Sequence, residues 1–377
     1  MKAVVRGLAA AFLTLMIIAP ASAQIDTAAR EAYLVDMSTG TVLLDKNGDR
    51  AMPPASMSKI MTVYAVFDRI RQGRLSLDDH LPVSERAWRM GGSKMFVELG
   101  SEIRVEDLLR GVIVQSGNDA CVVLAEGLAG SEEAFARELN TLAKEIGLKD
   151  SQFRNATGWP AEGHVMSARD LANLAERMIR EFPELYPLYS EREFTWHDIT
   201  QPNRNPLLYR NIGADGLKTG HTQEAGYGLT ASAVQDGRRL ILVVTGLESQ
   251  RQRAEEAERL MRWGFREFDN FKLFEAGSVI EEAEVWLGSQ QRVPLVAEED
   301  VLVTLRHAAR DQVTAKVTYD SPLPAPIAAG QQVATLHISG PGIAEHQVPL
   351  VAGVEVAEAG HFGRIFQKAR HLLLERE

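Results

Sequence analysis

Two β-hairpin patterns stand far apart in this chain, one at each end of a long run of helical patterns. The first pairs residues 32–36 with 41–45, and the second pairs 227–234 with 239–245, in each case across a short turn that contains glycine. Apolar stretches bounded by such turns are typical of antiparallel strands. Strands at both ends of a helical middle predict an antiparallel sheet covered by helices, which is the α+β arrangement.

The helical patterns can be given approximate bounds from their apolar periodicity. We expect helices at 58–72, 105–129, 132–146, 168–180 and 253–268. After the last of these helices the sequence pattern changes, and short apolar runs alternate with Gly, Pro and Asp-Ser breaks. The clearest runs are 301–305, 313–319 and 332–338. This later part predicts a small β-sandwich or barrel as a second domain.

The first residues have the layout of a secretory signal peptide. Lys2 and Arg6 precede an apolar run at 8–19, and an Ala-Ser-Ala cleavage site follows at 21–23. A transmembrane anchor is the alternative, but the run is shorter than the ~20 apolar residues that a bilayer requires. We therefore expect cleavage before Gln24 and export of the mature chain.

These patterns divide the chain into four predicted segments. They are a signal peptide at 1–23, a mixed helical and β domain at 24–271, a β-rich domain at 272–358 and a terminal helix at 359–377.

Composition excludes several classes of protein. The formal net charge of −10 over 377 residues argues against a nucleic-acid partner. Export often brings disulfides, but Cys121 is the only cysteine, so packing alone must hold the fold. Cys121 follows a serine motif closely enough for a reactive role to be imagined, although a small buried apolar side chain is the simpler interpretation.

The stretch PASMSKIMT at 54–62 places a hydroxyl and an amine one helical turn apart in an apolar setting. Pro53 and Pro54 disfavour helix before them, so a helix should begin near Ser56. Ser56 and Lys59 then lie on one face, close enough for a hydrogen bond. Burial disfavours the charged amine and lowers its pKa, and an adjacent neutral amine activates a serine nucleophile.

Two further motifs follow in an informative order. Ser116-Gly117-Asn118 comes after a helical pattern, and Lys218-Thr219-Gly220 precedes the strand predicted at 227–234. A lone S-x-x-K is expected by chance about once in a chain of this length, so by itself it indicates little. S-x-x-K, S-x-N and K-T-G in this order are the signature of penicillin-recognising serine acyltransferases.

At these residues the chain resembles a known family, the low-molecular-mass penicillin-binding proteins that are serine D-alanyl-D-alanine carboxypeptidases. The resemblance covers nearly the whole mature chain. It is carried by AYLVDMSTGTVL at 32–43, PASMSKIMT at 54–62, QSGNDAC at 115–121, NRNPLL at 203–208 and DGLKTGHTQEAGYGLTASA at 215–233. It implies a transpeptidase-like first domain, a β-rich second domain and a C-terminal amphipathic membrane helix.

The resemblance implies catalytic roles for three side chains. Ser56 would attack the carbonyl between the two terminal D-alanines of a peptidoglycan stem peptide, and Lys59 would accept its proton. Ser116 would relay a proton to the leaving amine. Water would then release the shortened peptide from the acyl-enzyme, and penicillins would acylate the same serine.

The remaining motif residues are expected to hold the substrate. Asn118 would hydrogen-bond a substrate amide, and Lys218 would supply positive charge. Thr219 would lie near the terminal carboxylate, beside Gly220. The backbone N–H groups of Ser56 and His221 would form the oxyanion hole.

An arginine should also meet the substrate carboxylate, because its planar fork can donate two hydrogen bonds to it. The resemblance points to Arg253, with Arg204 as a second cation near the site. For Arg253, a solvated charge at the start of a glutamate-rich helix is the alternative.

The sequence predicts no metal and no cofactor. His164 and His221 are the histidines nearest the motifs, and neither has metal-ligand spacing. The segment Asn155-Ala156-Thr157-Gly158-Trp159 matches one version of the loop below the site, whereas other family members carry a histidine near Thr157. This departure leaves the substrate preference and the deacylation rate open.

The C-terminal residues 362–373 form an amphipathic pattern with a basic face. Such a helix suits an anchor on anionic lipid, and the resemblance implies peripheral attachment to the periplasmic face of the cytoplasmic membrane. Packing on its own domain is the alternative, since the tail lacks Trp and Tyr and ends in Glu-Arg-Glu.

Two other functions share these features. A β-lactamase would have the same fold and motifs, but Glu-x-x-Leu-Asn is absent between Asn118 and Lys218, and Ser-Gly-Asn stands where class A enzymes have Ser-Asp-Asn. A non-catalytic penicillin-binding scaffold acting through its β-domain is the second alternative. The presence of every catalytic residue type weighs against it.

Overall fold

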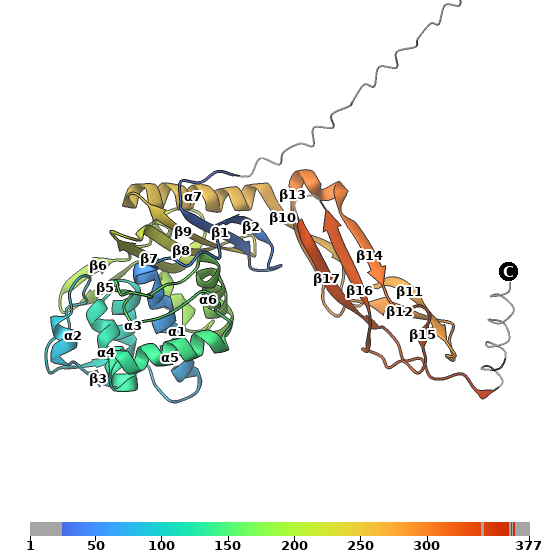
Figure 1. The fold of residues 1–377 in the computed structure, drawn as a ribbon, viewed down its shortest axis with the longest axis horizontal. Helices are drawn as coiled ribbons and strands as arrows, with labels where there is room; N and C mark the ends of the chain where they lie inside the picture. Colours follow the sequence, from blue (N-terminus) through green and yellow to red (C-terminus); the bar gives the residue numbers. More distant parts are fainter. Residues whose placement is uncertain (1–24, 341–342, 362, 364, 366–377) are drawn as a thin grey trace, which may run out of the picture.

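The computed structural model describes residues 25–340, 343–361, 363 and 365, and it has two parts (Figure 1). The predicted signal peptide at 1–23 and most of the predicted terminal helix at 359–377 lie outside the described residues. Within the described residues, every helix is too short or too polar to cross a membrane.

A five-stranded antiparallel sheet organises the first part, with the strand order β2-β1-β9-β8-β7. Its strands are β1 (Glu31–Asp36), β2 (Val42–Lys46), β7 (Ala214–Thr222), β8 (Gly226–Gln235) and β9 (Arg238–Leu247). The two predicted hairpins are joined because β1 pairs with β9, with Leu34 opposite Leu242. The prediction of an α+β domain built on one antiparallel sheet is therefore confirmed.

Helices cover both faces of this sheet (Figure 1). Helix α7 (Gln250–Glu267) packs on one face, and α6 (Ala168–Glu181) packs on the other, next to a cluster of helices. The cluster contains α1 (Lys59–Arg71), α3 (Val105–Ile113), α4 (Asn118–Ala129) and α5 (Glu132–Glu145).

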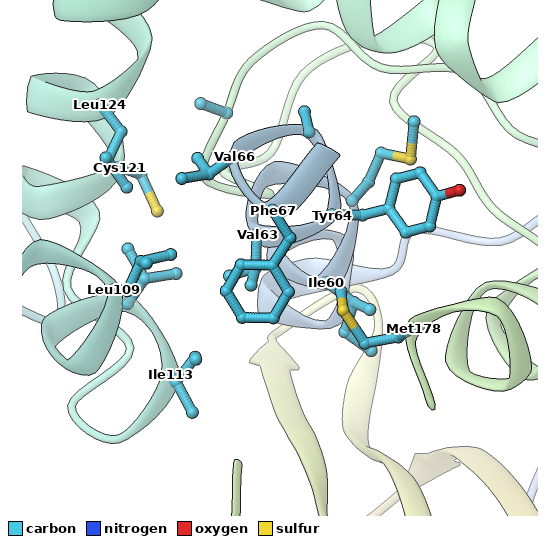
Figure 2. Close-up of a cluster of buried hydrophobic side chains, with 14 of the residues drawn as sticks. Ile60, Val63, Tyr64, Val66, Phe67, Leu109, Ile113, Cys121, Leu124 and Met178 are labelled. Atoms are coloured by element: carbon cyan, nitrogen blue, oxygen red, sulfur yellow. The ribbon is translucent and has the colours of Figure 1, made fainter. Parts of the chain in front are cut away.

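Helix α1 lies at the centre of this cluster and is buried on all sides (Figure 2). Val63 and Phe67 face apolar side chains such as Leu109 of α3, and Ile60 lies on the side of Met178 of α6. A helix that is apolar all round belongs in the interior. The packing fixes the start of α1, where Lys59 lies, between the sheet and the other helices.

One predicted helix is wrong. The pattern at 105–129 is two helices, α3 and α4, because the chain turns sharply between them. Ser116 has a φ of 59°, which is left-handed and cannot continue a helix. A Cβ on the next residue, Gly117, would lie 2.8 Å from Asp119 Oδ1 and 3.3 Å from the Gly111 carbonyl oxygen. The break places Ser116 in the turn and Asn118 at the start of α4.

The sequence patterns also missed a strand. The Lys218-Thr219-Gly220 motif, for which no strand was predicted, lies inside β7 at the edge of the sheet. Smaller elements complete the first part: η1 (Ala55–Ser58), α2 (Glu85–Arg89), η2 (Tyr186–Ser190), η3 (Pro206–Tyr209), and the two-stranded pairs β3 (His80–Pro82) with β4 (Glu102–Arg104) and β5 (Glu193–Trp196) with β6 (Ile199–Pro202).

The second part is β-rich, as predicted, and extends away from the first (Figure 1). Its strands form a six-stranded sheet, β14-β16-β17-β12-β11-β15, and a two-stranded sheet, β10-β13, around their own apolar core. The bounds are β10 (Phe268–Phe274), β11 (Val279–Trp286), β12 (Arg292–Val296), β13 (Val301–Arg306), η4 (His307–Gln312), β14 (Thr314–Thr318), β15 (Leu323–Pro324), β16 (Gln332–Gly340) and β17 (Ile343–Ala352).

A buried arginine ties the two parts together. Arg238 donates a hydrogen bond to Asp36 within the sheet and another to the carbonyl oxygen of Phe268, where β10 begins. Thr39 in the first hairpin contacts Thr304 of β13 through their hydroxyl groups. Helix α7 leads into β10 without a linker, and the exact boundary at 271 and 272 stays a prediction.

Candidate active site

The segment before α1 places Ser56 and Lys59 side by side. Ser56 lies in the 3₁₀ turn η1, and Lys59 is the first residue of α1. Lys59 Nζ lies 2.9 Å from Ser56 Oγ, the contact that their spacing predicts. Met57, which lies between them, is buried, so the turn is held against the core while Ser56 stays partly accessible.

Lys59 is fully buried and has two further partners. Its Nζ donates to Asn118 Oδ1 at 2.7 Å and to the Thr157 carbonyl oxygen at 2.6 Å. Both atoms only accept hydrogen bonds, so they take two of the amine's hydrogens and leave its third position facing Ser56. In a neutral amine that third position is the lone pair, which can accept the serine proton.

The surroundings favour the neutral amine. Burial lowers the pKa of Lys59 to about 8, and the positive charge of Arg204 acts in the same direction. Burial also lowers the pKa of Lys218 well below its ordinary value, with the charges of Lys59 and Arg204 adding to the effect. Several cationic groups therefore share this site, and each disfavours protonation of the others.

The turn between α3 and α4 supplies Ser116 and Asn118. Ser116 lines the pocket next to Ser56, and its Oγ forms no hydrogen bond with the described residues. The Asn118 side chain uses its oxygen for Lys59 and donates one N–H to the carbonyl oxygen of Gly91 at 2.9 Å. The second N–H of its amide can therefore donate a hydrogen bond to a substrate, whereas its oxygen already accepts one from Lys59.

Strand β7 forms the opposite wall of the pocket. Thr219, Gly220 and His221 line it, while the Lys218 side chain lies buried behind them and contacts the Thr219 carbonyl oxygen at 3.2 Å. Gly220 is required by the close approach of η1, because a Cβ there would lie 2.8 Å from the Pro54 carbonyl oxygen. His221 is exposed, and its ring stacks on Tyr227 with 3.8 Å between centroids.

Both predicted arginines reach this pocket, which has a volume of about 430 Å³. Arg253 comes from the first turn of α7 and is 7% exposed, so it is not the solvated charge that was its alternative. Its Nε has no hydrogen-bond partner among the described residues, and its guanidinium lies 5.9 Å from the ring centroid of Tyr227. Burial lowers the pKa of Arg253 to about 10, so it remains cationic at neutral pH. Arg204 donates to Ser93 Oγ at the pocket wall.

Sequence reasoning gave no role to two residues of the site, Thr157 and Asp119. Thr157 acts through its backbone carbonyl, which no side-chain motif reveals. Asp119 is fully buried and accepts hydrogen bonds from the backbone N–H groups of three consecutive residues, Met95, Phe96 and Val97. It thereby holds the segment 91–97, whose Gly91 carbonyl oxygen positions Asn118. The only available signal was an acidic residue directly after the Ser-Gly-Asn motif.

Two residues remain outside the site's chemistry. Cys121 is buried, and burial raises the pKa of its thiol to about 12, which agrees with an apolar packing role. His164 is buried below the segment that carries Thr157, and it does not line the pocket of Ser56. Within the part of the chain that the structure describes, no three His, Cys, Asp or Glu side chains are grouped so as to hold a metal ion.

Comparison with known proteins places this geometry in a family. The peptidase S11 family model, described as D-alanyl-D-alanine carboxypeptidase, matches residues 18–249. The chain belongs to this family. The model of the C-terminal domain of penicillin-binding protein 5 matches residues 268–358, which is the β-rich part.

Individual relatives extend the likeness over almost the whole chain. D-alanyl-D-alanine carboxypeptidase DacC of Escherichia coli is 38% identical over 97% of this chain and 95% of its own length. The structure is similar to that of penicillin-binding protein 5 from Haemophilus influenzae, with a TM-score of 0.81, 38% identity and coverage of 89% of this chain and 99% of the other.

A third similarity concerns a complex with an antibiotic. Penicillin-binding protein D2 from Listeria monocytogenes, solved in its ampicillin-bound form, has a TM-score of 0.59 and 30% identity to this chain. It covers 64% of this chain, and 98% of that protein is matched. The carboxypeptidase activity expected from the sequence is confirmed by the family membership and by these relatives.

Proposed function

We propose that Ser56 is the nucleophile of this carboxypeptidase and that Lys59 is its general base. The observation that carries the proposal is the 2.9 Å contact between Lys59 Nζ and Ser56 Oγ, with the other two positions of the amine held by Asn118 and Thr157. A lysine whose pKa is lowered to about 8 and whose third position faces the serine hydroxyl is suited to take the serine proton.

The reaction proceeds through an acyl-enzyme. Ser56 Oγ bonds to the carbonyl carbon between the two terminal D-alanines as its proton passes to Lys59. The carbonyl oxygen takes the negative charge and accepts hydrogen bonds from the backbone N–H groups of Ser56 and His221. When the C–N bond breaks, the amine of the leaving D-alanine receives a proton through Ser116. Water then hydrolyses the ester and restores Ser56.

The substrate's terminal carboxylate binds at the other end of the pocket. Thr219 offers a hydroxyl there, and Arg253 offers a guanidinium whose Nε is buried and has no partner in the part of the chain that the structure describes. A buried donor without an acceptor is costly, so a carboxylate that completes its hydrogen bonding is favoured. Arg204 adds positive charge beside this position, and the amine of Lys218 lies buried beneath it. The remaining Asn118 N–H meets the substrate's amide carbonyl.

β-Lactam antibiotics acylate the same serine, because they too present a carbonyl next to a carboxylate. The test is the intact mass of the purified mature protein after mixing with a penicillin, followed over time, with Ser56→Ala as the control. A one-to-one adduct that persists for minutes and is lost in the variant supports the proposal. Consumption of the penicillin without a lasting adduct would indicate a β-lactamase, and neither adduct nor consumption would contradict the assignment of Ser56.

We also propose that the protein is exported to the periplasm and held on the outer face of the cytoplasmic membrane by residues 359–377. The support is the sequence pattern at each end, together with the family membership. Mass analysis of the exported protein should find a chain that begins at Gln24. Liposomes with anionic lipid should pellet the full chain but not a chain that ends at Gly360, and equal pelleting would rule out the anchor.

A further inference from the structure

The loop that carries Thr157 is held from two sides by side chains of helices. Ala156, the residue before Thr157, is fully buried, and both polar groups of its backbone are hydrogen-bonded. Its carbonyl oxygen accepts from Thr62 Oγ1 of α1 at 2.7 Å, and its N–H donates to Glu132 Oε1 of α5 at 3.1 Å. The position of the Thr157 carbonyl oxygen, which accepts from Lys59, therefore depends on one side chain of each helix.

Glu132 is the one described side chain outside the loop that accepts a backbone N–H of residues 156–159. Asn155 Oδ1 accepts two of the other three N–H groups, and the Thr157 hydroxyl accepts the third. The loop is thus a turn that its own side chains order, as asparagine side chains commonly do. Its orientation against α1 is set from outside, and the Ala156 N–H is one of the groups through which this happens.

Both oxygens of the Glu132 carboxylate have hydrogen-bond partners. Oε1 accepts the Ala156 N–H, and Oε2 accepts a hydrogen bond from Arg86 of α2 at 2.6 Å. Arg86 also donates to Glu133, the next residue of α5, at 2.9 Å. The two carboxylates differ in exposure, since the Glu132 side chain is 8% exposed and that of Glu133 is 60% exposed. Both lie in the first turn of α5, where a negative charge is favoured by the helix dipole, but Glu132 is the one that contacts the loop.

The carboxylate also acts on the amine through its charge. Negative charge on Glu132 favours the protonated form of Lys59, so it raises the pKa of Lys59 against the larger, opposite effect of burial. The other titratable and charged groups that face this amine come from α4, β7 and two loops: Asp119, Cys121, Lys218, His164 and Arg204. The carboxylate among them acts in the same direction as Glu132, and the two basic side chains act in the opposite direction when charged. The thiol and the imidazole are neutral near pH 7, because burial raises the pKa of the thiol to about 12 and lowers that of the imidazole to about 4.

We propose that Glu132 is a positioning residue for the reaction at Ser56. By accepting the Ala156 N–H, it holds the carbonyl oxygen of Thr157 at the place where that atom orients the Lys59 amine. Without this acceptor the fully buried Ala156 N–H would be unpaired, which is costly, so the loop would shift to satisfy it. The charge of Glu132 has a second, separable effect, because it stabilises the protonated amine. The inference rests on the proposed function, since it takes Lys59 as the base.

The test measures acylation by a fluorescent penicillin in stopped flow, from about pH 6 to pH 10. Each profile gives a limiting rate at high pH and a midpoint. Glu132→Ala removes both the acceptor and the charge, so the limiting rate should fall at least about tenfold, as for loss of one buried hydrogen bond, and the midpoint should move to lower pH. The limiting rate reports how the neutral amine is oriented, whereas the midpoint reports how easily it loses its proton.

Two conservative variants separate the two effects. Glu132→Gln keeps an acceptor for the Ala156 N–H and loses the charge, so the limiting rate should stay within about twofold of the wild-type rate while the midpoint falls by at least about 0.3 pH unit. Glu132→Asp keeps the charge but is one methylene shorter, so the limiting rate should fall while the midpoint stays near that of the wild type. Hydrogen exchange at Ala156 should be faster in Glu132→Asp and Glu132→Ala than in Glu132→Gln. Glu133→Gln, which removes an exposed carboxylate from the same turn and the same arginine, should leave all three quantities unchanged.

The outcomes separate this inference from the proposed function. Wild-type acylation by Lys59→Arg would remove Lys59 as the base and overturn both. Slow acylation by Lys59→Arg, together with wild-type limiting rates in Glu132→Ala and Glu132→Asp, would overturn the positioning role and leave the proposed function intact. Equal falls in the limiting rate of all the Glu132 variants and of Glu133→Gln would show a general loss of order at the start of α5, and would also overturn the positioning role.

Discussion

The carbonyl oxygen of Thr157 accepts a 2.6 Å hydrogen bond from Lys59 Nζ, although Thr157 lies outside all three motifs. This bond and that of Asn118 fix the direction in which the amine's lone pair points. The loop around Thr157 therefore helps to orient the amine of Lys59, the proposed base.

Acylation of Ser56 should depend on pH through Lys59. In the proposed mechanism the neutral amine of Lys59 is the active form, and burial lowers its pKa to about 8. The acylation rate should therefore rise as the pH increases through about 8 and be lower at more acidic pH. Stopped-flow acylation by a fluorescent penicillin measures this directly. Lys59→Arg cannot lose its proton and should lower the rate about 10²–10⁴-fold. A wild-type rate that is flat between about pH 6 and 9 would contradict the role of Lys59.

Arg253→Ala should raise KM for D-Ala-D-Ala peptides about tenfold to a hundredfold, because a charged hydrogen bond to the substrate carboxylate is lost. Steady-state kinetics separates this from an effect on kcat. Arg253→Lys should restore little of the lost substrate affinity, since a lysine cannot donate in parallel to both carboxylate oxygens. Arg251→Ala, whose side chain is 87% exposed on the same helix, is the control. An unchanged KM in Arg253→Ala would remove this residue from the site.

Gly158→Ala should strongly destabilise the active-site loop. Gly158 has a φ of +75°, and a Cβ there would lie 2.0 Å from the Ala55 carbonyl oxygen, next to Ser56. Gly100 has the same φ of +75° with nothing within 4 Å, so Gly100→Ala measures the backbone strain alone, about 1–2 kcal/mol. Denaturant unfolding should show a larger loss for Gly158→Ala, together with slower penicillin acylation. Equal losses of unfolding free energy in the two variants would mean that the loop can shift away from the Ala55 carbonyl oxygen without an energetic cost.

Asp119→Asn should loosen the segment 91–97. The two carboxylate oxygens together accept three consecutive backbone N–H groups, and the amide nitrogen that replaces one oxygen cannot accept the hydrogen bonds made at that position. We expect a loss of about 1–3 kcal/mol in the free energy of unfolding. Faster hydrogen exchange at 91–97 and slower penicillin acylation should accompany it.

The matched control for this variant is Asp78→Asn, which removes a carboxylate that is 83% exposed and pairs with Arg104 on the surface. Exposed pairs contribute little, so its unfolding free energy should change by less than about 1 kcal/mol. Unchanged exchange at 91–97 in Asp119→Asn would show that the segment is held by other contacts.

Much of the fold followed from local pattern. The two hairpins, the helices at 132–146 and 168–180 and the β-rich second part are all present, because each rests on apolar periodicity that its own residues set. The helix predicted at 105–129 failed because apolar residues at helical spacing stand on both sides of the polar stretch 115–119, while the backbone at Ser116 is left-handed and Asn118 donates its N–H to the carbonyl oxygen of Ser93. Strand β7 was missed because its glycines and its position at the edge of the sheet weaken the apolar pattern by which a strand is identified.

The sequence by itself determined which chemical groups are present and their order: a serine with a lysine one turn away, a serine and an amide, and a lysine on a glycine-containing segment. It also determined the Ser56 to Lys59 contact, since neighbours at i and i+3 meet in any helical turn. The tertiary structure alone decided which way the amine points and which arginine is buried with an unpaired donor. Those properties depend on Thr157, Asn118 and β7, which packing brings together from distant parts of the chain, so no local pattern could reveal them.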